Sequence, residues 1–446
     1  MMPTMERDTP ASRFDAAWCR RQFPALDRTV AGRPAVYLDG PGGSQVPRRV
    51  IDAVVDYLAR TNANHGGMFA TSRQSDALLD AAHRAVADLF GTADPETIVF
   101  GANMTSLTFA LSRALARTWQ PGDEIVVTRM DHDANVSPWV LAARDAGATV
   151  RHVAIRAEDC TLDLDDLAGK ITPQTRLVAV AAASNAVGTI NPVDRIAALA
   201  HQGGALVFVD AVHYAPHGSL DVGRWGCDFV AASAYKFFGP HVGVLWGRRE
   251  LLTKLPAYKV RPAPDAIPGR WMTGTQNHEG IAGTMAAVEY LADLGRNLDP
   301  QAADRRAALE SAYAAIVAHE RQLTETLLVG IRELPEFRVW GITDPARLDQ
   351  RVPTVAITHR TIAPRELAAG LAEQGLFVWH GNFYALALSE ALGLEPEGML
   401  RIGLMHYNTH EEVRGLLRAL AEVSGGSSAR SPSTTVGGPP SLPGKC

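Results

Sequence analysis

A single lysine, Lys236, stands inside the long apolar stretch "CDFVAASAYKFFGPHVGVLWG" (residues 227–247). A lysine in such surroundings loses its charge, forms an ion pair or reacts, because an isolated ammonium group is costly to bury. Desolvation favours the neutral amine, a nucleophile that can form a Schiff base with an aldehyde. Lys236 is therefore a candidate for covalent chemistry.

Polar residues also follow four other apolar runs that have the composition of strands. Asp210 follows "ALVFV", Asn185 follows "RLVAVAAAS", His132 follows "EIVVTRMD" and Thr105 follows "TIVFGANM". In a mostly parallel sheet the carboxyl ends of the strands meet at one edge, and ligands bind beyond that edge. We expect these residues to converge there with Lys236.

The residue types match the functional groups of pyridoxal 5'-phosphate. The aldehyde needs the amine of Lys236, and the pyridine nitrogen needs a carboxylate such as Asp210 to stay protonated as an electron sink. The flat ring can stack on His132. Each residue alone could equally be a helix cap, a turn or part of an ion pair, but their joint order favours a cofactor site. The phosphate group needs amides and hydroxyl groups at a helix start, for which the candidates are Met104, Thr105 and Ser233.

Strand-like runs alternate with helical patterns between residues 97 and 247, which predicts a mostly parallel sheet covered by helices. In "TSLTFALSRALARTW" (105–119), apolar residues recur at helical spacing on one face. Seven strands are expected, and several of them are continuously apolar, as strands buried on both faces should be. They are 97–101, 124–128, 149–153, 176–184, 205–211, 227–235 and 242–247.

The pattern changes after about residue 285. Long helices are expected within 301–335, followed by strands at "FRVWGI", "TVAITH", "LFVWHG" and "MLRIGL" and a helix at "PRELAAGLAEQG". Thr409 and Glu412 have the spacing of a capping box before the last helix. We predict an N-terminal arm (1–30), a large cofactor-binding domain (31–284), a small α+β domain (285–423) and a disordered tail (424–446).

Composition describes an ordinary globular protein of 446 residues with a net charge of -5, which gives no indication of nucleic-acid binding. No apolar run approaches the ~18 residues of a membrane span, and the N-terminus does not resemble a signal peptide. We therefore predict a cytoplasmic protein with no membrane partner. The cysteines are scattered, which favours a reducing compartment: Cys19, Cys160, Cys227 and Cys446.

Four segments resemble the class V aminotransferases, in the cysteine desulfurase-like branch of fold-type I pyridoxal-phosphate enzymes. They are "MDHDANVSPW", "SNAVGTINPV", "VDAVHYAPH" and "SAYKFFGPHVGVLW", and the resemblance extends from "YLDGPGGSQVP" (37–47) to "RIGLMHYNTHEEV" (401–413). It implies a large domain with a mostly parallel sheet and a smaller C-terminal α+β domain. It also implies that Lys236 forms the Schiff base, Asp210 pairs with the pyridinium and His132 stacks on the ring.

The resemblance implies further contacts. Arg401 corresponds to the arginine that binds the substrate α-carboxylate, and the turn "DGPGG" with Gly40 could add backbone amides. Thr275 in "GTQN" corresponds to a residue that reaches the phosphate of the neighbouring subunit, which implies a homodimer with composite sites. The resemblance also implies that Asn185 and His213 contact the phenolic oxygen of the cofactor, although many relatives have Gln in place of His213. It implies that Thr105, Ser233 and Tyr235 contact the phosphate group, although relatives often have His in place of Tyr235.

One part of the pattern is absent. Cysteine desulfurases carry a nucleophilic cysteine on a loop before the carboxylate arginine, whereas the corresponding segment here, "LFVWHGNFYALALSEALG" (376–393), has none. Tyr384 or a close neighbour takes that place, and we expect His380 and Tyr384 to bind substrate. The prediction is a C–S β-lyase that acts on cysteine or an S-substituted cysteine. Decarboxylating oxidative deamination, transamination or epimerisation of a modified amino acid in natural-product biosynthesis stay open.

Two other classes fit less well. A metal-dependent hydrolase could use "DHD" (131–133) with His213 and His217, but these residues lack a compact helical His pair. A nucleotide-binding protein is weaker still, because "DGPGGSQ" is followed by no G-K-[ST] motif. The sequence therefore predicts a cofactor enzyme with no metal site.

Overall fold

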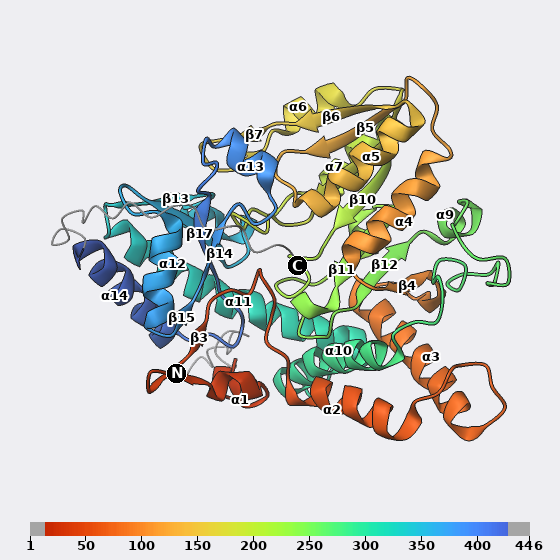
Figure 1. Ribbon diagram of the computed structural model, residues 1–446, viewed down its shortest axis with the longest axis horizontal. Coiled ribbons are helices and arrows are strands. Elements are labelled where there is room, and N and C mark those ends of the chain that lie inside the picture. The colour runs from red at the N-terminus through yellow and green to blue at the C-terminus, as the bar shows by residue number, and fades with distance from the viewer. Residues whose placement is uncertain (1–13, 427–446) are drawn as a thin grey trace, which may run out of the picture.

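A seven-stranded sheet forms the centre of the computed structural model, which describes residues 14–426 (Figure 1). The strand order is β4-β12-β11-β10-β9-β5-β6, and neighbours are parallel except for β12, which is antiparallel to both of its partners. The predicted mostly parallel sheet is thus confirmed. The strands are β4 (Ile98–Gly101), β5 (Glu124–Thr128), β6 (Thr149–Val153), β9 (Thr175–Ala181), β10 (Leu206–Asp210), β11 (Phe229–Ser233) and β12 (Gly243–Gly247).

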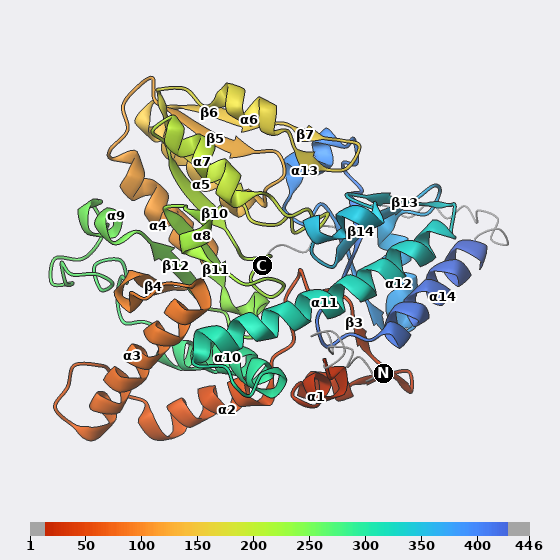
Figure 2. The ribbon, with the colours of Figure 1, turned by 180° about the vertical axis from the view of Figure 1, so that it is seen from behind.

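Helices cover both faces of this sheet, which is why its inner strands are largely apolar and buried, whereas the edge strand β6 is mostly exposed. In β9, Val178 and Val180 point into the core on one face, and Leu177 and Ala179 point into the core on the other. The helices α4 (Met104–Ala116) and α5 (Ser137–Ala146) cover the face seen in Figure 1. The opposite face, seen in Figure 2, is covered by α7 (Val193–Gln202) and α8 (Val222–Trp225).

A second, antiparallel sheet of order β13-β14-β17-β16 forms the smaller unit. Its strands are β13 (Phe337–Trp340), β14 (Thr354–His359), β16 (Trp379–Gly381) and β17 (Met399–Gly403). One face packs on α12 (Pro364–Glu373), α14 (His410–Gly426) and the end of α11 (Arg305–Arg332). The predicted capping box of α14 is confirmed, because the Thr409 amide donates to Glu412 at 3.0 Å and the Glu412 amide donates to Thr409 Oγ1 at 3.2 Å.

The remaining elements connect and flank the two sheets. The helices are α1 (Ala16–Arg21), α2 (Arg48–Asp56), α3 (Ala70–Phe90), α6 (Leu164–Lys170), α9 (Arg249–Lys254), α10 (His278–Leu298) and α13 (Leu386–Ala391). The two-residue strands are β1 (Thr29–Val30), β2 (Arg33–Pro34), β3 (Val36–Tyr37), β7 (Ile155–Arg156), β8 (Thr161–Leu162) and β15 (Leu376–Phe377). Within residues 14–426, no helix has both the length and the apolar character needed to cross a bilayer.

The hydrophobic core of the large sheet gives way to that of the small sheet along α11, and not at residue 285. Helix α10 contributes Ile281, Val288 and Leu291 to the core of the large sheet, so the predicted boundary at 284/285 falls inside a helix of that unit. On α11 the core of the small sheet begins at Leu323, and Leu38 from the N-terminal part of the chain also belongs to this core. Residues 1–13 of the predicted arm and 427–446 of the predicted tail lie outside the described residues, and 424–426 belong to α14.

Candidate active site

The polar residues that follow the strands lie at the carboxyl edge of the large sheet. Asp210 is the last residue of β10, Lys236 ends the 3-10 turn after β11, and His132 precedes the 3-10 turn after β5. The charge of Lys236 acts on the pKa of Asp210, His132 and His213 alike, and that of Arg401 acts on His132 and His213. The structure therefore brings Lys236, Asp210, His132 and His213 of the large sheet together with Arg401 of the small sheet.

The amine of Lys236 is prepared for nucleophilic chemistry. Burial, and then the charge of Arg401, lower the pKa of Lys236 to about 7, although Asp39 and Asp210 oppose the shift. Its Nζ donates to the Pro41 carbonyl and lies 4.7 Å from the centroid of the Tyr235 ring. A large share of the amine is thus neutral near pH 7.

Asp210 is a buried carboxylate that accepts a hydrogen bond from a backbone amide. Burial raises the pKa of Asp210 to about 6, against the effect of the Val212 amide, which donates to Oδ1 at 2.8 Å, and of Lys236. A cationic ring nitrogen beside Asp210 would supply the missing countercharge. The side chain thus fits the predicted pyridinium partner.

Ser233 meets the N-terminus of α4, where a phosphate group is expected. The Met104 amide donates to Ser233 Oγ at 2.9 Å, and Thr105 occupies the first turn of α4. Tyr235 follows in the next turn and stacks on His241 with ring centroids 4.9 Å apart. The Ser233 hydroxyl group and the Met104 amide therefore lie together at the start of α4, and their contact with a phosphate group stays a prediction.

Arg401 on β17 is held by both units of the protein. Its Nη2 donates to Asp39 Oδ1 at 2.9 Å, its Nη1 donates to the Asn185 carbonyl at 3.1 Å, and its guanidinium lies 4.3 Å from the centroid of the Phe383 ring. The side chain is 4% exposed, and Nε has no hydrogen-bond partner among residues 14–426. A substrate carboxylate would compete with Asp39 for this planar fork.

A strained turn closes over the site. Phe383 and Tyr384 both have φ of 58°, in the left-handed region that bulky residues rarely adopt. The Asn185 side chain donates to the Phe383 carbonyl at 2.8 Å, and the Tyr384 ring stacks on His132 with centroids 5.3 Å apart. Burial, and then the charge of Lys236, lower the pKa of His132 to about 4, so this imidazole is neutral near pH 7. The turn thus contacts the His132 ring predicted to stack on the cofactor.

The structure differs from two predictions for the substrate. The amide of Gly40 donates to the Gly403 carbonyl at 3.2 Å, and those of Gly42 and Gly43 bond inside the turn, so these amides are not open to a carboxylate. Gly40 is needed instead for close packing, because a Cβ there would lie 2.4 Å from Met405 Sδ.

His380 is not brought to the site. It pairs with Leu400 across β16 and β17, whereas Trp379 pairs with Arg401. Side chains alternate between the faces of a strand, so His380 lies on the face opposite to Arg401. The sequence analysis did not predict the ion pair between Asp39, the acid before the glycine-rich turn, and Arg401. The two residues are far apart in the sequence, and no motif links them.

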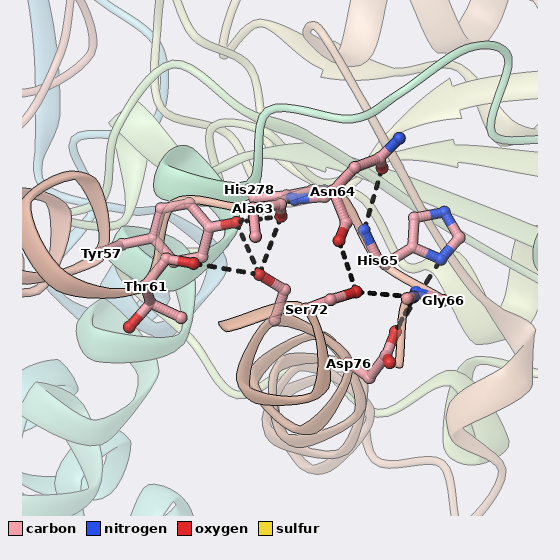
Figure 3. Close-up of polar contacts among 11 residues, drawn as sticks. Tyr57, Thr61, Ala63, Asn64, His65, Gly66, Ser72, Asp76 and His278 are labelled. Carbon is pink, nitrogen blue, oxygen red and sulfur yellow. Dashed lines mark hydrogen bonds and ion pairs between the residues drawn. The ribbon is translucent and has the colours of Figure 1, made fainter. Parts of the chain in front are cut away.

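Thr275 lies apart from Lys236 within one chain. It lines a cavity of about 940 Å³ with Asn64, His65, Asp76 and other residues, but Lys236, Asp210 and Arg401 are not part of this lining. Figure 3 shows how the neighbouring segment 62–67 is held: the Tyr57 hydroxyl donates to the Ala63 carbonyl at 3.1 Å, Ser72 Oγ donates to the Asn64 carbonyl at 2.7 Å, and the Gly66 amide donates to Asp76 at 2.9 Å.

The "DHD" segment does not build a metal site. Asp131 accepts hydrogen bonds from the Ala181 amide at 2.8 Å and from the Asn135 side chain at 3.1 Å, and so connects this segment to the end of β9. His217 pairs with Glu320. Within the described part of the chain, His, Cys, Asp and Glu side chains do not gather in groups of three that could hold a metal ion.

Comparisons with known proteins cover nearly the whole chain. The family model for aminotransferase class V matches residues 36–416. An aminotransferase-like protein of Gibberella zeae is 34% identical over 422 residues, 93% of this chain and 99% of the relative. A probable cysteine desulfurase of Streptomyces coelicolor is 32% identical over 433 residues, 92% of this chain and 97% of the relative. The apo structure of a cysteine desulfurase from Thermococcus onnurineus NA1 has a TM-score of 0.81 at 27% identity and covers 91% of this chain and 97% of that chain.

Proposed function

Because the chain belongs to the class-V aminotransferase family, whose members are pyridoxal-phosphate enzymes, we propose that it is a C–S β-lyase. Its substrate is cysteine or an S-substituted cysteine, and its products are a thiol, pyruvate and ammonia. The observation that carries this proposal is the turn at Phe383 and Tyr384, which contacts the site and contains no thiol.

The site residues fit pyridoxal phosphate. Lys236 supplies an amine whose pKa of about 7 leaves a substantial share neutral near pH 7, Asp210 a buried carboxylate without a full countercharge, and Ser233 a hydroxyl group at the start of α4. When bound, pyridoxal phosphate supplies an electron sink for the Cα of the amino acid. We propose that Asn185 and His213 contact the phenolic oxygen of the cofactor, as the resemblance implies.

The chain's own residues can carry the proton steps. Arg401 binds the α-carboxylate with two parallel hydrogen bonds and so fixes the orientation of the Cα–H bond. Lys236, whose pKa lies near 7, removes the Cα proton as a general base. The Cβ–S bond then breaks, its electron pair leaves on the thiolate, and a proton from solvent restores the thiol. One water molecule is consumed for each thiol, pyruvate and ammonium ion formed.

The described cysteines do not offer a sulfur acceptor. Cys19, Cys160 and Cys227 are free and fully buried, and burial raises the pKa of each thiol. Relatives named cysteine desulfurases support C–S cleavage, and the absence of a cysteine in 376–393 supports release of the sulfur as a free thiol.

Product analysis tests the proposal. Purified protein loaded with pyridoxal phosphate is incubated with cysteine and a panel of S-alkyl and S-aryl cysteines, and the products are identified by mass spectrometry. We expect pyruvate and the free thiol in equal amounts, and neither with the Asp210→Ala variant. An intact C–S bond with loss of the amine or the carboxylate would contradict the lyase. Transamination is the specific alternative, favoured by the aminotransferase-like relative, and decarboxylating deamination or epimerisation would be detected in the same assay.

We further propose a homodimer with composite sites, because Thr275 lies apart from Lys236 in one chain. The cytoplasmic location and a role in natural-product biosynthesis stay predictions from the sequence.

A further inference from the structure

One face of the small sheet carries a row of side chains that crosses all four strands. Arg401 on β17 is directly opposite Ala356 on β14 and Trp379 on β16, and Ala356 is opposite Trp340 on β13. Residues directly opposite each other project from the same face of a sheet, with their Cβ atoms about 5 Å apart. The row therefore begins and ends with a tryptophan, and Trp379 is the direct neighbour of the predicted carboxylate site.

The two tryptophans of this row differ in burial. Trp340 is 6% exposed, belongs to a hydrophobic core, and its Nε1 donates to Thr358 Oγ1 at 3.0 Å. Trp379 is 58% exposed and belongs to none of the hydrophobic cores formed within residues 14–426. It lies on β16, an edge strand, where charged side chains are the usual protection against association. Folding of the sheet therefore does not explain a large aromatic ring at this position.

A second exposed aromatic ring follows in the same segment. Tyr384 is 66% exposed, and its ring stacks on His132, whereas Phe383 is buried against the Arg401 guanidinium. The segment then crosses to the large unit, where α13 lies beside β7 in Figure 1 and, from behind, in Figure 2. Trp379 thus adjoins the predicted carboxylate site, and Tyr384 adjoins the histidine predicted to stack on the cofactor.

We propose that Trp379 and Tyr384 hold a flat aromatic group on the sulfur atom of the substrate, so that S-aryl cysteines are preferred over cysteine and S-alkyl cysteines. The inference rests on the proposed function, because it takes Arg401 as the carboxylate site for an S-substituted cysteine. With the α-carboxylate on Arg401, the group beyond Sγ extends toward the two exposed rings. Stacked or edge-to-face contact with them removes apolar ring area from water.

The size and charge of this segment support an uncharged aromatic substituent. Cysteine has no group beyond Sγ and would leave both rings in water. Leu386, which is 44% exposed, adds apolar surface two residues after Tyr384. Residues 376–389 contain no Asp, Glu, Lys or Arg, so the segment offers no ion pair to a charged substituent. Contact with the faces and edges of aromatic rings is the recognition that remains.

Ligand binding to the cofactor-loaded Lys236→Ala protein, which lacks the general base, tests the inference. Titration calorimetry measures Kd for S-phenylcysteine, S-methylcysteine and S-cyclohexylcysteine, the last being similar in size to the first but not aromatic. We expect S-phenylcysteine to bind at least about tenfold more tightly than S-methylcysteine, and more tightly than S-cyclohexylcysteine. Adding Trp379→Ala should reduce the preference for S-phenyl over S-methyl to about twofold or less, whereas Trp379→Phe should retain most of it.

His380 offers a matched control, because it is exposed on the same edge strand but lies on the opposite face. His380→Ala should keep the preference for S-phenylcysteine. Equal affinities for the three ligands, or a preference that Trp379→Ala leaves unaltered, would overturn the proposal. An unaltered preference together with a changed oligomeric state of Trp379→Ala would assign the ring to a subunit contact instead.

The outcome is separable from that of the lyase assay. Binding to Lys236→Ala requires no cleavage of the C–S bond, so a deaminating or transaminating enzyme would still show the preference for S-phenylcysteine. Pyruvate and thiol formed by the wild type without any aromatic preference in binding would overturn this inference alone.

Discussion

Individual residues of the site are buried in pairs whose charges depend on one another. Lys236 and Asp210 both lean toward their uncharged forms, because burial lowers the pKa of the amine and raises that of the carboxyl. Their positions directly after strands made them predictable from sequence. The partner of Arg401, Asp39, was not predictable, since it lies 362 positions away and its place depends on the packing of two sheets.

Replacing Arg401 with Lys should weaken substrate binding more than turnover. Lysine keeps the charge but loses the planar fork and the contact with the Phe383 ring. We expect KM for the amino acid to rise about tenfold or more, since a charged hydrogen bond contributes about 1.5–3 kcal/mol. Steady-state kinetics check this, with the exposed Arg360→Lys as control. An unchanged KM would remove Arg401 from the carboxylate site.

The pH dependence of stability should reveal the buried amine. Between about pH 7 and the ordinary value of 10.5, the unfolded chain keeps a proton on Lys236 that the folded chain has lost, so stability rises with pH in this window. Lys236→Met should therefore raise the Tm of cofactor-free protein most below about pH 7, and the gain should vanish above about pH 10. Scanning calorimetry of both proteins checks this; a gain independent of pH would indicate that Lys236 is not desolvated.

Some secondary-structure elements have the bounds that the sequence pattern predicts, whereas the short hairpins β1–β2 and β7–β8 were not expected. Strands β5, β6 and β14 begin and end where the apolar runs predict. The run "LFVWHG" was expected as one strand, but it is divided, because Leu376–Phe377 pairs with β3 and Trp379–Gly381 pairs with β17. This division turns Trp379, rather than His380, toward the face of Arg401. A change of pairing partner leaves no trace in periodicity.

The turn at Phe383 and Tyr384 should both strain the backbone and influence which S-substituted cysteines the enzyme prefers. Tyr384→Gly relieves a left-handed φ at an exposed side chain, so the free energy of unfolding should rise by about 1 kcal/mol. The same change removes the ring stacked on His132 and should reduce the preference among S-substituents. Urea unfolding and kcat/KM ratios for S-aryl against S-alkyl cysteines measure the two effects. A stability gain with unchanged ratios would show that Tyr384 does not select substrates.

At the scale of the whole molecule, the alternation of strands and helices predicted the large sheet, and the change in pattern predicted a second unit. The boundary between them was placed too early, because α10 is as apolar as a core helix of either unit and only its packing assigns it to the large sheet. Packing also decides which residues Thr275 would meet in a dimer, and the sequence around Thr275 does not reveal them.

Mixing two inactive variants tests the composite sites. If Thr275 serves the neighbouring subunit, a heterodimer of Lys236→Ala and Thr275→Ala contains one intact site. After subunit exchange, the mixture should regain about a quarter of wild-type activity, because half of the dimers are mixed and each has one working site. Activity no higher than that of the separate variants would place Thr275 outside the neighbour's site.

The central claim is that Lys236 binds the cofactor covalently. Borohydride reduction of the loaded protein, followed by peptide mass spectrometry, measures this most directly. We predict a reduced pyridoxyl group on Lys236 in the wild type and in the control Lys254→Ala, and no modified lysine in Lys236→Ala, although that variant still binds the cofactor. Modification of another lysine, or full activity of Lys236→Ala, would contradict the account.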